Sequence, residues 1–377
     1  MAVKVVHLVR QYHPSIGGME DVVKNIARHQ RLFRNQSARI VTLDRLFRNS
    51  QVRLAPTTVV DGIDVTRLPF FGSDRYPICP QVLAQVTDAD VIHVHGIDFF
   101  FDYLAATKSI HRKKLVASTH GGFFHTNFMR SFKKAYFNTV TRLSAHAYDR
   151  IVASSDNDGR IFSELVTPPK LMVIENGVDV EKYRGNAAEE RRPSMIYFGR
   201  WSRNKALDAV LSLFAQLVRL HPQWTLVLAG REYDHGAEEL LAWADMLGVG
   251  DAVRIAPNPS DGELADLIRQ ASYFICLSKH EGFGLAPIEA MSAGLIPILS
   301  DIPPFRHLVE QSGLGFLLDA DHPDRLIADL VNFHRDKSVE HGRQRQRALA
   351  FSERYDWRHV ADGYVRIYEE LAERHDE

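Results

Sequence analysis

The sequence predicts an α/β protein made of two Rossmann-like, doubly wound domains, with a final helix that crosses back to the first domain. Three observations lead to this prediction. The chain has 377 residues, more than one hydrophobic core usually organises. Both halves contain short runs of Val, Ile and Leu between longer amphipathic segments, the rhythm of strand–helix–strand units. Many runs lack polar alternation, as strands covered by helices on both faces do.

Twelve runs are expected to be strands. In the first half they are residues 3–9, 39–43, 63–68, 91–95, 115–118, 150–153 and 171–174. In the second half they are residues 194–198, 225–229, 253–256, 273–277 and 296–299. The polar stretch 184–193 is typical of a linker. We therefore expect a first domain over residues 1–185, a second over residues 186–356, and a helix over residues 357–377 that packs on the first domain.

Composition excludes several classes of protein. Hydrophobic residues make up 45% of the chain and charged residues 25%, which excludes disordered, collagen-like and coiled-coil proteins. No run approaches the roughly 18 apolar residues of a membrane span, and the N-terminus enters a strand without a signal peptide. We therefore expect a cytoplasmic protein. Cys79 and Cys276 lie in unlike contexts, which disfavours a disulfide framework and a thiolate zinc site.

Charge is unevenly distributed. Residues 1–185 hold 25 basic and 17 acidic side chains, whereas residues 186–377 hold 21 basic and 30 acidic ones. Between residues 107 and 148 there are eight basic residues and no acid. This concentration of positive charge predicts an anionic partner for the first half.

The basic stretch has a predicted apolar face and a predicted cationic face. The apolar face, expected to be core, holds Phe132, Tyr136, Val140, Leu143 and Ala147. Aromatic and basic residues lie outside this face, among them Met129 and Phe137. Together with two lysines earlier in the stretch they give a candidate cationic surface, which consists of Lys113, Lys114, Phe128, Arg130, Lys133 and Lys134. Such a surface favours an anionic membrane leaflet. A plain solvated face stays open, and nucleic acid is disfavoured because no nucleic-acid motif accompanies the patch.

The loop after the first strand contains the pair Gly17–Gly18 at the start of a helix. A glycine pair there lets the backbone approach an anionic ligand closely. Neither GxGxxG nor GxxxxGK[ST] occurs in the chain, which disfavours hydride transfer on a dinucleotide and phosphoryl transfer by a P-loop. An ordinary connecting loop is the alternative.

A sharper pattern follows the strand at residues 273–277. Glu281 and Glu289 are eight positions apart, with the amides of Gly282, Phe283, Gly284 and Leu285 between them at the start of a helix. We expect Glu289 to lie about two turns into that helix. A nucleoside diphosphate-sugar suits this layout, with amides on phosphate and carboxylates on sugar and ribose hydroxyls. The alternative makes Glu281 a capping acid and Glu289 a structural partner.

Two cations follow the strand at residues 194–198. Arg200 and Lys205 are five residues apart behind Gly199. Fixed cations stabilise the negative charge that grows on a diphosphate as it leaves a sugar, and this predicts a role in the transition state. A solvated loop with surface cations is the alternative.

Histidines are numerous, 18 in all, and several lie near strand ends. His93 and His95 point to one face of a strand without a third ligand nearby in sequence, so each is expected to be structural and no metal site is predicted. His120 differs, because it ends a strand and precedes Gly121–Gly122. We expect it to face the ligand.

Together these motifs resemble the family-4 retaining glycosyltransferases of the GT-B fold, whose two domains face each other across a cleft. The resemblance runs end to end. It implies that Gly17–Gly18 lies near the phosphates and acceptor, that His120 contacts the donor sugar, and that Arg200 and Lys205 hold the diphosphate. It also implies that Glu281 faces the sugar and Glu289 the ribose.

Other stretches, 9–20, 95–100, 120–126 and 300–305, resemble the family members that add α-1,3-mannose from GDP-mannose to a cellobiosyl-diphosphate polyprenol. This implies a nucleotide-sugar donor, a polyprenyl-diphosphate-linked acceptor, no metal cofactor, and a peripheral place on the inner membrane face. Arg231, among the expected donor-binding residues, stands where many members have a small or neutral residue. Ala206 replaces a usual glycine, and Pro304–Phe305 a usual Pro–Glu pair. Another donor or acceptor, or a sugar-nucleotide epimerase of the same fold, remains the alternative.

Overall fold

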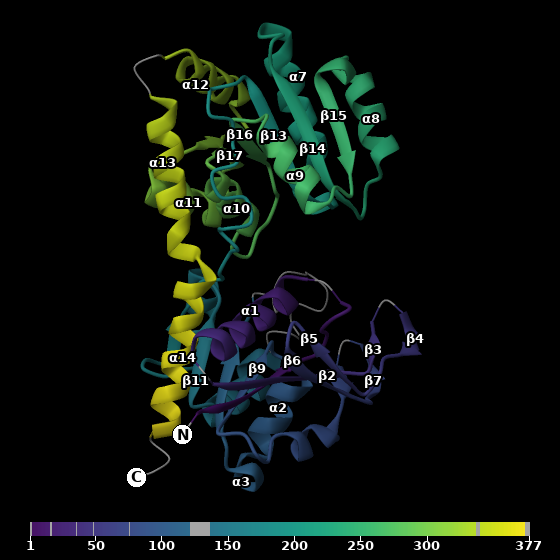
Figure 1. The fold of residues 1–377 in the computed structure, drawn as a ribbon, viewed down its shortest axis with the longest axis vertical. Helices are drawn as coiled ribbons and strands as arrows, with labels where there is room; N and C mark the ends of the chain where they lie inside the picture. Colours follow the sequence, from purple (N-terminus) through teal and green to yellow (C-terminus); the bar gives the residue numbers. More distant parts are fainter. Residues whose placement is uncertain are drawn as a thin grey trace. The chain divides into compact units, whose positions relative to one another are not determined.

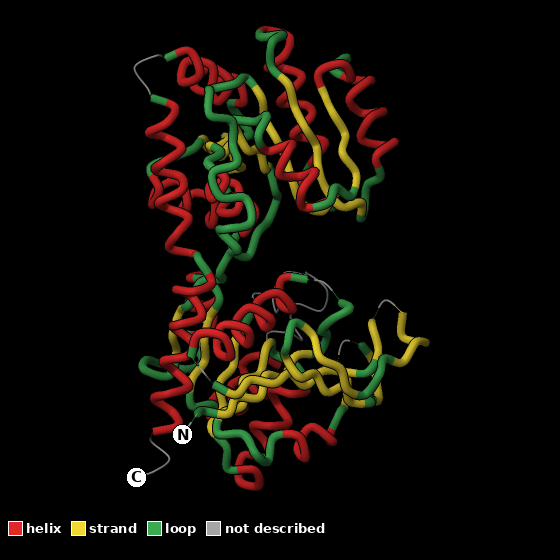
Figure 2. The backbone as a smooth tube through the Cα atoms, viewed as in Figure 1, coloured by secondary structure: helices red, strands yellow, loops and turns green. Residues whose placement is uncertain are grey.

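A computed structural model describes residues 2–373 except residues 16, 35, 48, 75, 121–135 and 337–339. The chain divides into two compact units, drawn as a ribbon in Figure 1 and as a tube in Figure 2. Unit 1 comprises residues 1–177 and 357–377, and unit 2 comprises residues 178–356. Each unit is a Rossmann-like sheet with helices packed against it, so the predicted fold class is confirmed.

Eight strands form the main sheet of unit 1, in the spatial order β12-β11-β10-β9-β1-β2-β6-β5. They are β1 (Lys4–Val9), β2 (Ser37–Leu43), β5 (Thr57–Val60), β6 (Ile63–Leu68), β9 (Val91–His95), β10 (Lys114–Ser118), β11 (Arg150–Ala153) and β12 (Leu171–Val173). Only the β5–β6 pair is antiparallel among these described strands. The helical segments are α1 (Gly18–Phe33), η1 (Pro80–Gln85), α2 (Phe99–Ala106), α3 (Lys108–His111), η2 (Phe137–Thr141), α5 (Arg142–Ala147), α6 (Asp156–Phe162) and α14 (Trp357–Glu373).

The two faces of this sheet bury different residues because side chains alternate along a strand. One face packs on α2 and its neighbours. The other carries Val5 and Val91 and packs on α1 and α14, which lie side by side in Figure 1. The period of two places His7, His93 and His95 on the face that carries Val5 and Val91, and all three are buried. This sheet therefore holds polar side chains inside an apolar layer.

The C-terminal helix α14 belongs to unit 1. Its apolar stripe packs against α1 and the sheet, and five residues of the stripe are buried: Val360, Tyr364, Ile367, Tyr368 and Leu371. The spacing of these residues at three and four positions gives one continuous apolar face. The last segment of the chain therefore completes the first unit.

Six parallel strands form the sheet of unit 2, in the order β15-β14-β13-β16-β17-β18. They are β13 (Ser194–Trp201), β14 (Thr225–Glu232), β15 (Val253–Pro257), β16 (Tyr273–Cys276), β17 (Ile296–Ser300) and β18 (Phe316–Leu318). The helical segments are η3 (Arg203–Lys205), α7 (Leu207–Leu220), α8 (Ala237–Met246), η4 (Gly250–Ala252), α9 (Asp261–Ile268), α10 (Leu285–Ala293), α11 (Pro303–Ser312), α12 (Pro323–Arg335), α13 (His341–Ser352) and η5 (Glu353–Tyr355). One apolar core joins the sheet and its helices.

The chain passes from unit 1 to unit 2 between Gly177 and Val178, eight residues before the expected boundary. The residues that follow are fastened to unit 2. The Val178 amide donates to the Tyr355 carbonyl (2.7 Å), and Val180 and Tyr183 are buried in the core of unit 2. The predicted linker is also bound there, because the Ala187 amide donates to a carbonyl of α10. The stretch was predicted to be a linker because its side chains are polar, but its backbone is hydrogen-bonded to unit 2.

Several short strands escaped the sequence analysis. Four of them pair as two hairpins in unit 1: β3 (Arg45–Leu46) with β4 (Asn49–Arg53), and β7 (Phe71–Ser73) with β8 (Tyr76–Ile78). The edge strands β5 and β18 were missed as well. Each has at most five residues, too few to show a hydrophobic period.

The predicted apolar stripe over residues 132–147 is wrong in its second half. Leu143 is 77% exposed and Val140 39%, whereas Phe137, expected outside the stripe, is 2% exposed. Phe137–Thr141 form a π-helical turn, which adds a residue per turn and rotates the buried face away from the α-helical register. Phe132 lies outside the described residues.

Among the described residues, no helix combines the length and the apolar character that a membrane span requires.

Candidate active site

The strand order of each sheet reverses at one place. In open α/β sheets, ligands generally bind outside the carboxyl ends of the strands at such a switch point. In unit 2 this switch point lies between β13 and β16, whose carboxyl ends lead into Lys205 and Glu281; Arg200 lies within β13, next to its final residue. In unit 1 it lies between β1 and β9, next to β10. The predicted catalytic and donor-binding residues therefore lie at the carboxyl ends of strands at or beside the two switch points.

An ion pair joins the two loops at the switch point of unit 2. Lys205 Nζ lies 2.6 Å from Glu281 Oε1, and both side chains are largely shielded from solvent. The same loops are tied by Asn204, whose side-chain amide donates to the His280 carbonyl (2.6 Å) and whose carbonyl accepts from the Lys279 amide (2.9 Å). The structure thus brings together two residues that are 76 positions apart.

Arg200 and Arg231 are partners in the register of β13 and β14. Both are exposed, and the Arg200 guanidinium lies over the Tyr233 ring, 5.4 Å from its centroid. The strands meet closely one residue earlier, because a Cβ on Gly230 would lie 1.9 Å from the Gly199 carbonyl oxygen. Only glycine fits there. Three cations, those of Arg200, Arg231 and Lys205, lie at or just after the carboxyl ends of two adjacent strands.

The glycine-rich loop between the two glutamates begins α10. Gly284 is the N-cap with φ +93°, and a Cβ there would also lie 2.7 Å from the Phe305 ring. Phe283 packs 5.6 Å from the Tyr355 ring. The helix begins at Leu285, so Glu289 lies just over one turn inside it and not the two turns expected. Gly282 is exposed, and the amides here stand at the positive end of the helix.

Ala206 occupies a left-handed backbone conformation, with φ 48° and ψ 51°, immediately before α7. This conformation costs an L-residue about 1–2 kcal/mol, a cost that the glycine expected here from the resemblance would avoid. The helix begins at Leu207, so the strained residue lies at its boundary and not within it.

Two residues of unit 2 were missed by the sequence analysis. The hydroxyl of the buried Tyr197 donates to the Arg200 carbonyl (2.8 Å), which fixes the turn that carries Arg200. Burial raises the pKa of this phenol well above its usual value. Asp234 accepts from the Arg203 amide (3.0 Å) and ties the loop after β14 to the same turn. Tyr197 lies in an apolar run, where it looked like a core residue.

At the switch point of unit 1, Arg10 and Asp98 follow β1 and β9. Arg10 Nε lies 3.0 Å from Asp98 Oδ2, and the Asp98 side chain is 1% exposed. Asp98 also caps α2, accepting from the Phe100 amide (2.8 Å). Burial raises the pKa of Asp98 to about 6, although Arg10 opposes the rise. Sequence reasoning did not single out this pair, and its only signal was position at strand ends.

The Gly17–Gly18 pair lies in the same region. Gly17 precedes α1 in an extended conformation, and Gly18 is its first residue. A Cβ on Gly17 would lie 2.6 Å from a carboxylate oxygen of Glu20, and that side chain accepts from the Ser15 hydroxyl (2.7 Å). The glycine thus makes room for a carboxylate that orders the loop.

His120 lies two residues after β10, near the strand end as expected, and adopts a left-handed conformation with φ 48°. Its Nε2 lies 3.0 Å from His95 Nδ1, and its buried Nδ1 has no hydrogen-bond partner among the described residues. Burial lowers the pKa of His120 to about 4, so the ring is neutral at pH 7. A strained, neutral histidine with an unused nitrogen suits ligand contact.

The sequence analysis found no third potential metal ligand near His93 and His95. In the structure a third histidine, His7 of β1, lies beside them. His7, His93 and His95 place ring nitrogens within 4.8 Å of one another. Each ring nitrogen of the three already has a hydrogen-bond partner; those of His93 are the Tyr368 hydroxyl (2.6 Å) and the Ser118 hydroxyl (2.8 Å). Hydrogen bonding therefore accounts for this cluster.

The predicted cationic surface is only partly described. Phe128, Arg130, Lys133 and Lys134 lie outside the described residues, as does Met129. Lys113 and Lys114 are half-buried and lie at the amino end of β10, the end opposite His120. One lysine of the basic stretch forms an ion pair with an acidic residue just outside it: Lys108 Nζ lies 2.6 Å from Asp149 Oδ2.

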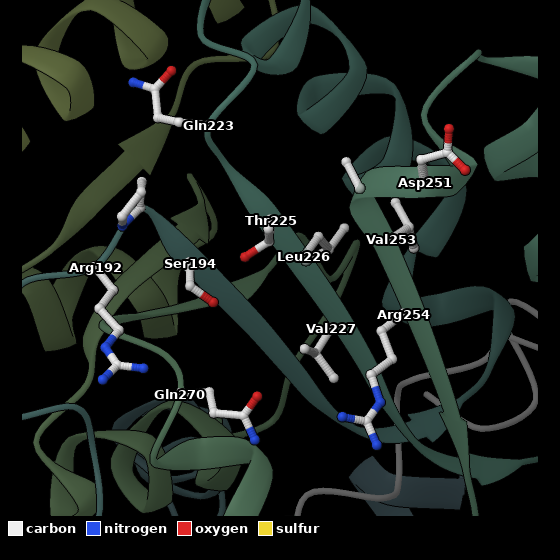
Figure 3. Close-up of a pocket in the computed structure, with 12 residues that line it drawn as sticks. Arg192, Ser194, Gln223, Thr225, Leu226, Val227, Asp251, Val253, Arg254 and Gln270 are labelled. Atoms are coloured by element: carbon white, nitrogen blue, oxygen red, sulfur yellow. The ribbon is translucent and has the colours of Figure 1, made fainter.

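Unit 2 also contains a cavity of about 440 Å³, shown in Figure 3. It lies at the amino ends of β13, β14 and β15, where Ser194, Thr225 and Arg254 line it. None of its lining residues is a predicted site residue. The cavity therefore lies at the end of the sheet opposite Arg200 and Glu281.

Two family models match the chain. Residues 16–182 match glycosyltransferase family 4, and residues 179–349 match the glycosyl transferases of group 1. The chain is 48% identical to the GDP-mannose:cellobiosyl-diphosphopolyprenol alpha-mannosyltransferase of Xanthomonas campestris, over 97% of this chain and 96% of the relative. It is 42% identical to the protein of that name from Komagataeibacter xylinus, over 98% and 94%.

A solved structure shares the whole fold. The crystal structure of Anabaena HepE in complex with UDP superimposes with a TM-score of 0.75 at 19% identity, covering 98% of this chain and 100% of the other. At this identity the likeness concerns the fold alone.

Burial of neutral histidines predicts that unit 1 loses stability in acid. The pKa of His7 falls from 6.5 to about 4 on folding because of its burial, so between these values the unfolded chain binds more protons and stability rises with pH. We expect the free energy of unfolding to be about 2 kcal/mol lower at pH 5 than at pH 7.5 from His7 alone. The pKa values of His93, His95 and His120 change in the same direction.

Hydrogen exchange of β1 peptides, corrected for the intrinsic rate at each pH, measures this loss. His7→Gln is the control, because glutamine does not titrate and should reduce the pH dependence. Equal protection of β1 at the two pH values in the unaltered protein would contradict the prediction.

Proposed function

The chain belongs to glycosyltransferase family 4, and from this premise we propose that it transfers mannose from GDP-mannose to a cellobiosyl group on a polyprenyl diphosphate, with retention of configuration and an α-1,3 linkage. The observation that carries the proposal is the identity of 42–48%, over nearly the whole chain, to proteins of that stated activity. The cations and carboxylates at the switch point of unit 2 support it.

The donor diphosphate would lie against Arg200, Lys205 and the amides of residues 282–285. Lys205 and Glu281 hold each other at 2.6 Å, so their positions are set before a ligand arrives. Cations and dipoles that are already oriented stabilise developing charge without reorganisation. Glu281 would accept from sugar hydroxyls and Glu289 from ribose hydroxyls.

The reaction would break the bond between C1 of mannose and the diphosphate oxygen while C1 bonds to the acceptor oxygen on the same face. The acceptor proton passes to the departing diphosphate oxygen. The leaving group thus serves as the base, and the chain supplies the positive charge that stabilises it. We further propose that transfer needs no metal, because these side chains occupy the role that a metal ion would have.

We also propose that the protein works on the inner membrane face, where a polyprenyl-linked acceptor is held. The aromatic and basic residues at 128–134 support this placement by composition.

Donor binding gives the first test. GDP should raise the melting temperature more than UDP or ADP at equal concentration. Arg200→Ala and Lys205→Ala should each lower the rate of transfer about 10- to 100-fold, because a charge-assisted hydrogen bond contributes about 1.5–3 kcal/mol. Arg254→Ala, which removes a guanidinium at the opposite end of the same sheet, is the matched control. Equal stabilisation by the three nucleotides would refute the assigned base.

Loss of Glu281 gives the second test. Glu281→Ala should reduce kcat/KM for transfer by at least about 100-fold, since the variant loses sugar contacts and leaves Lys205 unpaired. The assay follows radiolabelled mannose into the lipid fraction with EDTA present, which also tests the absence of a metal. The exposed Glu310 supplies the control Glu310→Ala.

Turnover like that of the unaltered protein in Glu281→Ala would contradict the assignment. Epimerisation of the donor in the absence of acceptor, followed by NMR, would favour a sugar-nucleotide epimerase instead.

Flotation with lipid vesicles tests the membrane placement. Binding should occur with phosphatidylglycerol vesicles and not with phosphatidylcholine vesicles. Replacing Arg130, Lys133 and Lys134 by Glu should weaken it at least about 100-fold, since each basic residue near an anionic surface contributes about 1 kcal/mol. Lys113→Glu with Lys114→Glu tests whether those residues share the surface. Equal binding to both vesicle types would contradict the proposal.

A further inference from the structure

A continuous chain of hydrogen bonds crosses the core of unit 1 from α14 to His120. Its five links join Glu369 to Gln36 (3.1 Å), Gln36 to Gln30 (3.2 Å), Gln30 to His7 (2.7 Å), His7 to His95 (3.0 Å) and His95 to His120 (3.0 Å). Glu369 is exposed, whereas the four residues between it and His120 are 0–6% exposed. The chain therefore connects the surface of the last helix to a predicted site residue.

Glu369 fixes the direction of the first links. A carboxylate only accepts hydrogen bonds, so Gln36 turns its NH₂ group toward Glu369 and its carbonyl oxygen toward Gln30. Gln30 then donates from Nε2 to Gln36 and presents Oε1 to His7. An amide oxygen also only accepts, so His7 must carry its proton on Nε2.

The histidines pass this direction on because each is neutral. Burial lowers the pKa of His7 and His120 to about 4 and that of His95 well below 6.5, and a neutral imidazole carries one proton. With its proton on Nε2, His7 accepts at Nδ1 from His95 Nε2. His95 in turn accepts at Nδ1 from His120 Nε2. His120 is left with a bare lone pair on Nδ1.

We infer that Glu369, Gln36, Gln30, His7 and His95 are positioning residues that hold His120 in its Nε2–H tautomer and make Nδ1 a dedicated hydrogen-bond acceptor. That nitrogen is buried and has no partner in the described part of the chain. A group facing it must donate, as a sugar hydroxyl can and a phosphate oxygen cannot. The sugar contact rests on the proposed function, whereas the tautomer does not.

A metal ion among His7, His93 and His95 is the competing interpretation of this cluster, since their nitrogens lie within 4.8 Å of one another. A metal would take nitrogens that are already engaged in the chain and would break it. The two interpretations therefore exclude each other and can be distinguished.

NMR of the ligand-free full-length protein with labelled histidine nitrogens tests the tautomer. His120→Gln identifies the His120 signals. In the unaltered protein we expect Nδ1 of His120 unprotonated and Nε2 protonated. In Glu369→Lys the ammonium only donates, so each link should reverse and the proton should move to Nδ1 of His120. Glu373→Lys makes the same charge change on an exposed residue of α14 outside the chain and should change nothing.

A protonated Nδ1 in the unaltered protein would overturn the inference, and so would an unmoved proton in Glu369→Lys. A stoichiometric shift of the His7, His93 and His95 signals on adding zinc chloride would overturn it in favour of a metal site.

Ligand affinity separates this inference from the proposed function. In Glu369→Lys the Kd of GDP-mannose should rise about fivefold, the loss of about one hydrogen bond, while the Kd of GDP stays unchanged. If the proton moves and both Kd values stay unchanged, the tautomer chain stands and the placement of the sugar at His120 falls.

Discussion

Parallel pairing is the constraint on which the candidate site depends. All strands of a parallel sheet end at the same edge, so residues far apart in sequence meet there without any further device. In unit 2 this brings Lys205 to Glu281, and it sets Arg200 beside Arg231 in register. This arrangement imposes a steric requirement, because β13 and β14 approach so closely that only glycine fits at position 230.

Much of this architecture could be predicted from the sequence. All twelve expected strands exist. Most of their Val- and Ile-rich runs are buried, as in β1, β9 and β16, whereas the edge strands β12 and β15 are partly exposed. Arg200, Lys205 and Glu281 were found because each lies a few residues after the end of such a run. The ion pair between Lys205 and Glu281 was not predicted. It depends on which strands are neighbours in the sheet, and local composition does not determine the strand order.

Other features escaped because they depend on tertiary contact. The polar stretch after Tyr183 reads as a linker, yet its backbone is bonded to unit 2. Leu143 reads as core, but a π-helical turn rotates it outward. His7 lies in an apolar strand, and nothing in the local sequence predicts a role for it. Its contact with His95 arises only because β1 pairs with β9. In each case the deciding partner is remote in sequence.

The discontinuity of unit 1 has a consequence for how the protein is made. One face of its sheet is covered in part by α14, which is synthesised only after the whole of unit 2. Until α14 is made, Val5, Val91 and His93 lack the part of their cover that this helix supplies. The nascent chain must therefore keep an unfinished apolar surface from aggregating while unit 2 is made, and unit 2 can fold before the unit that begins the chain is complete.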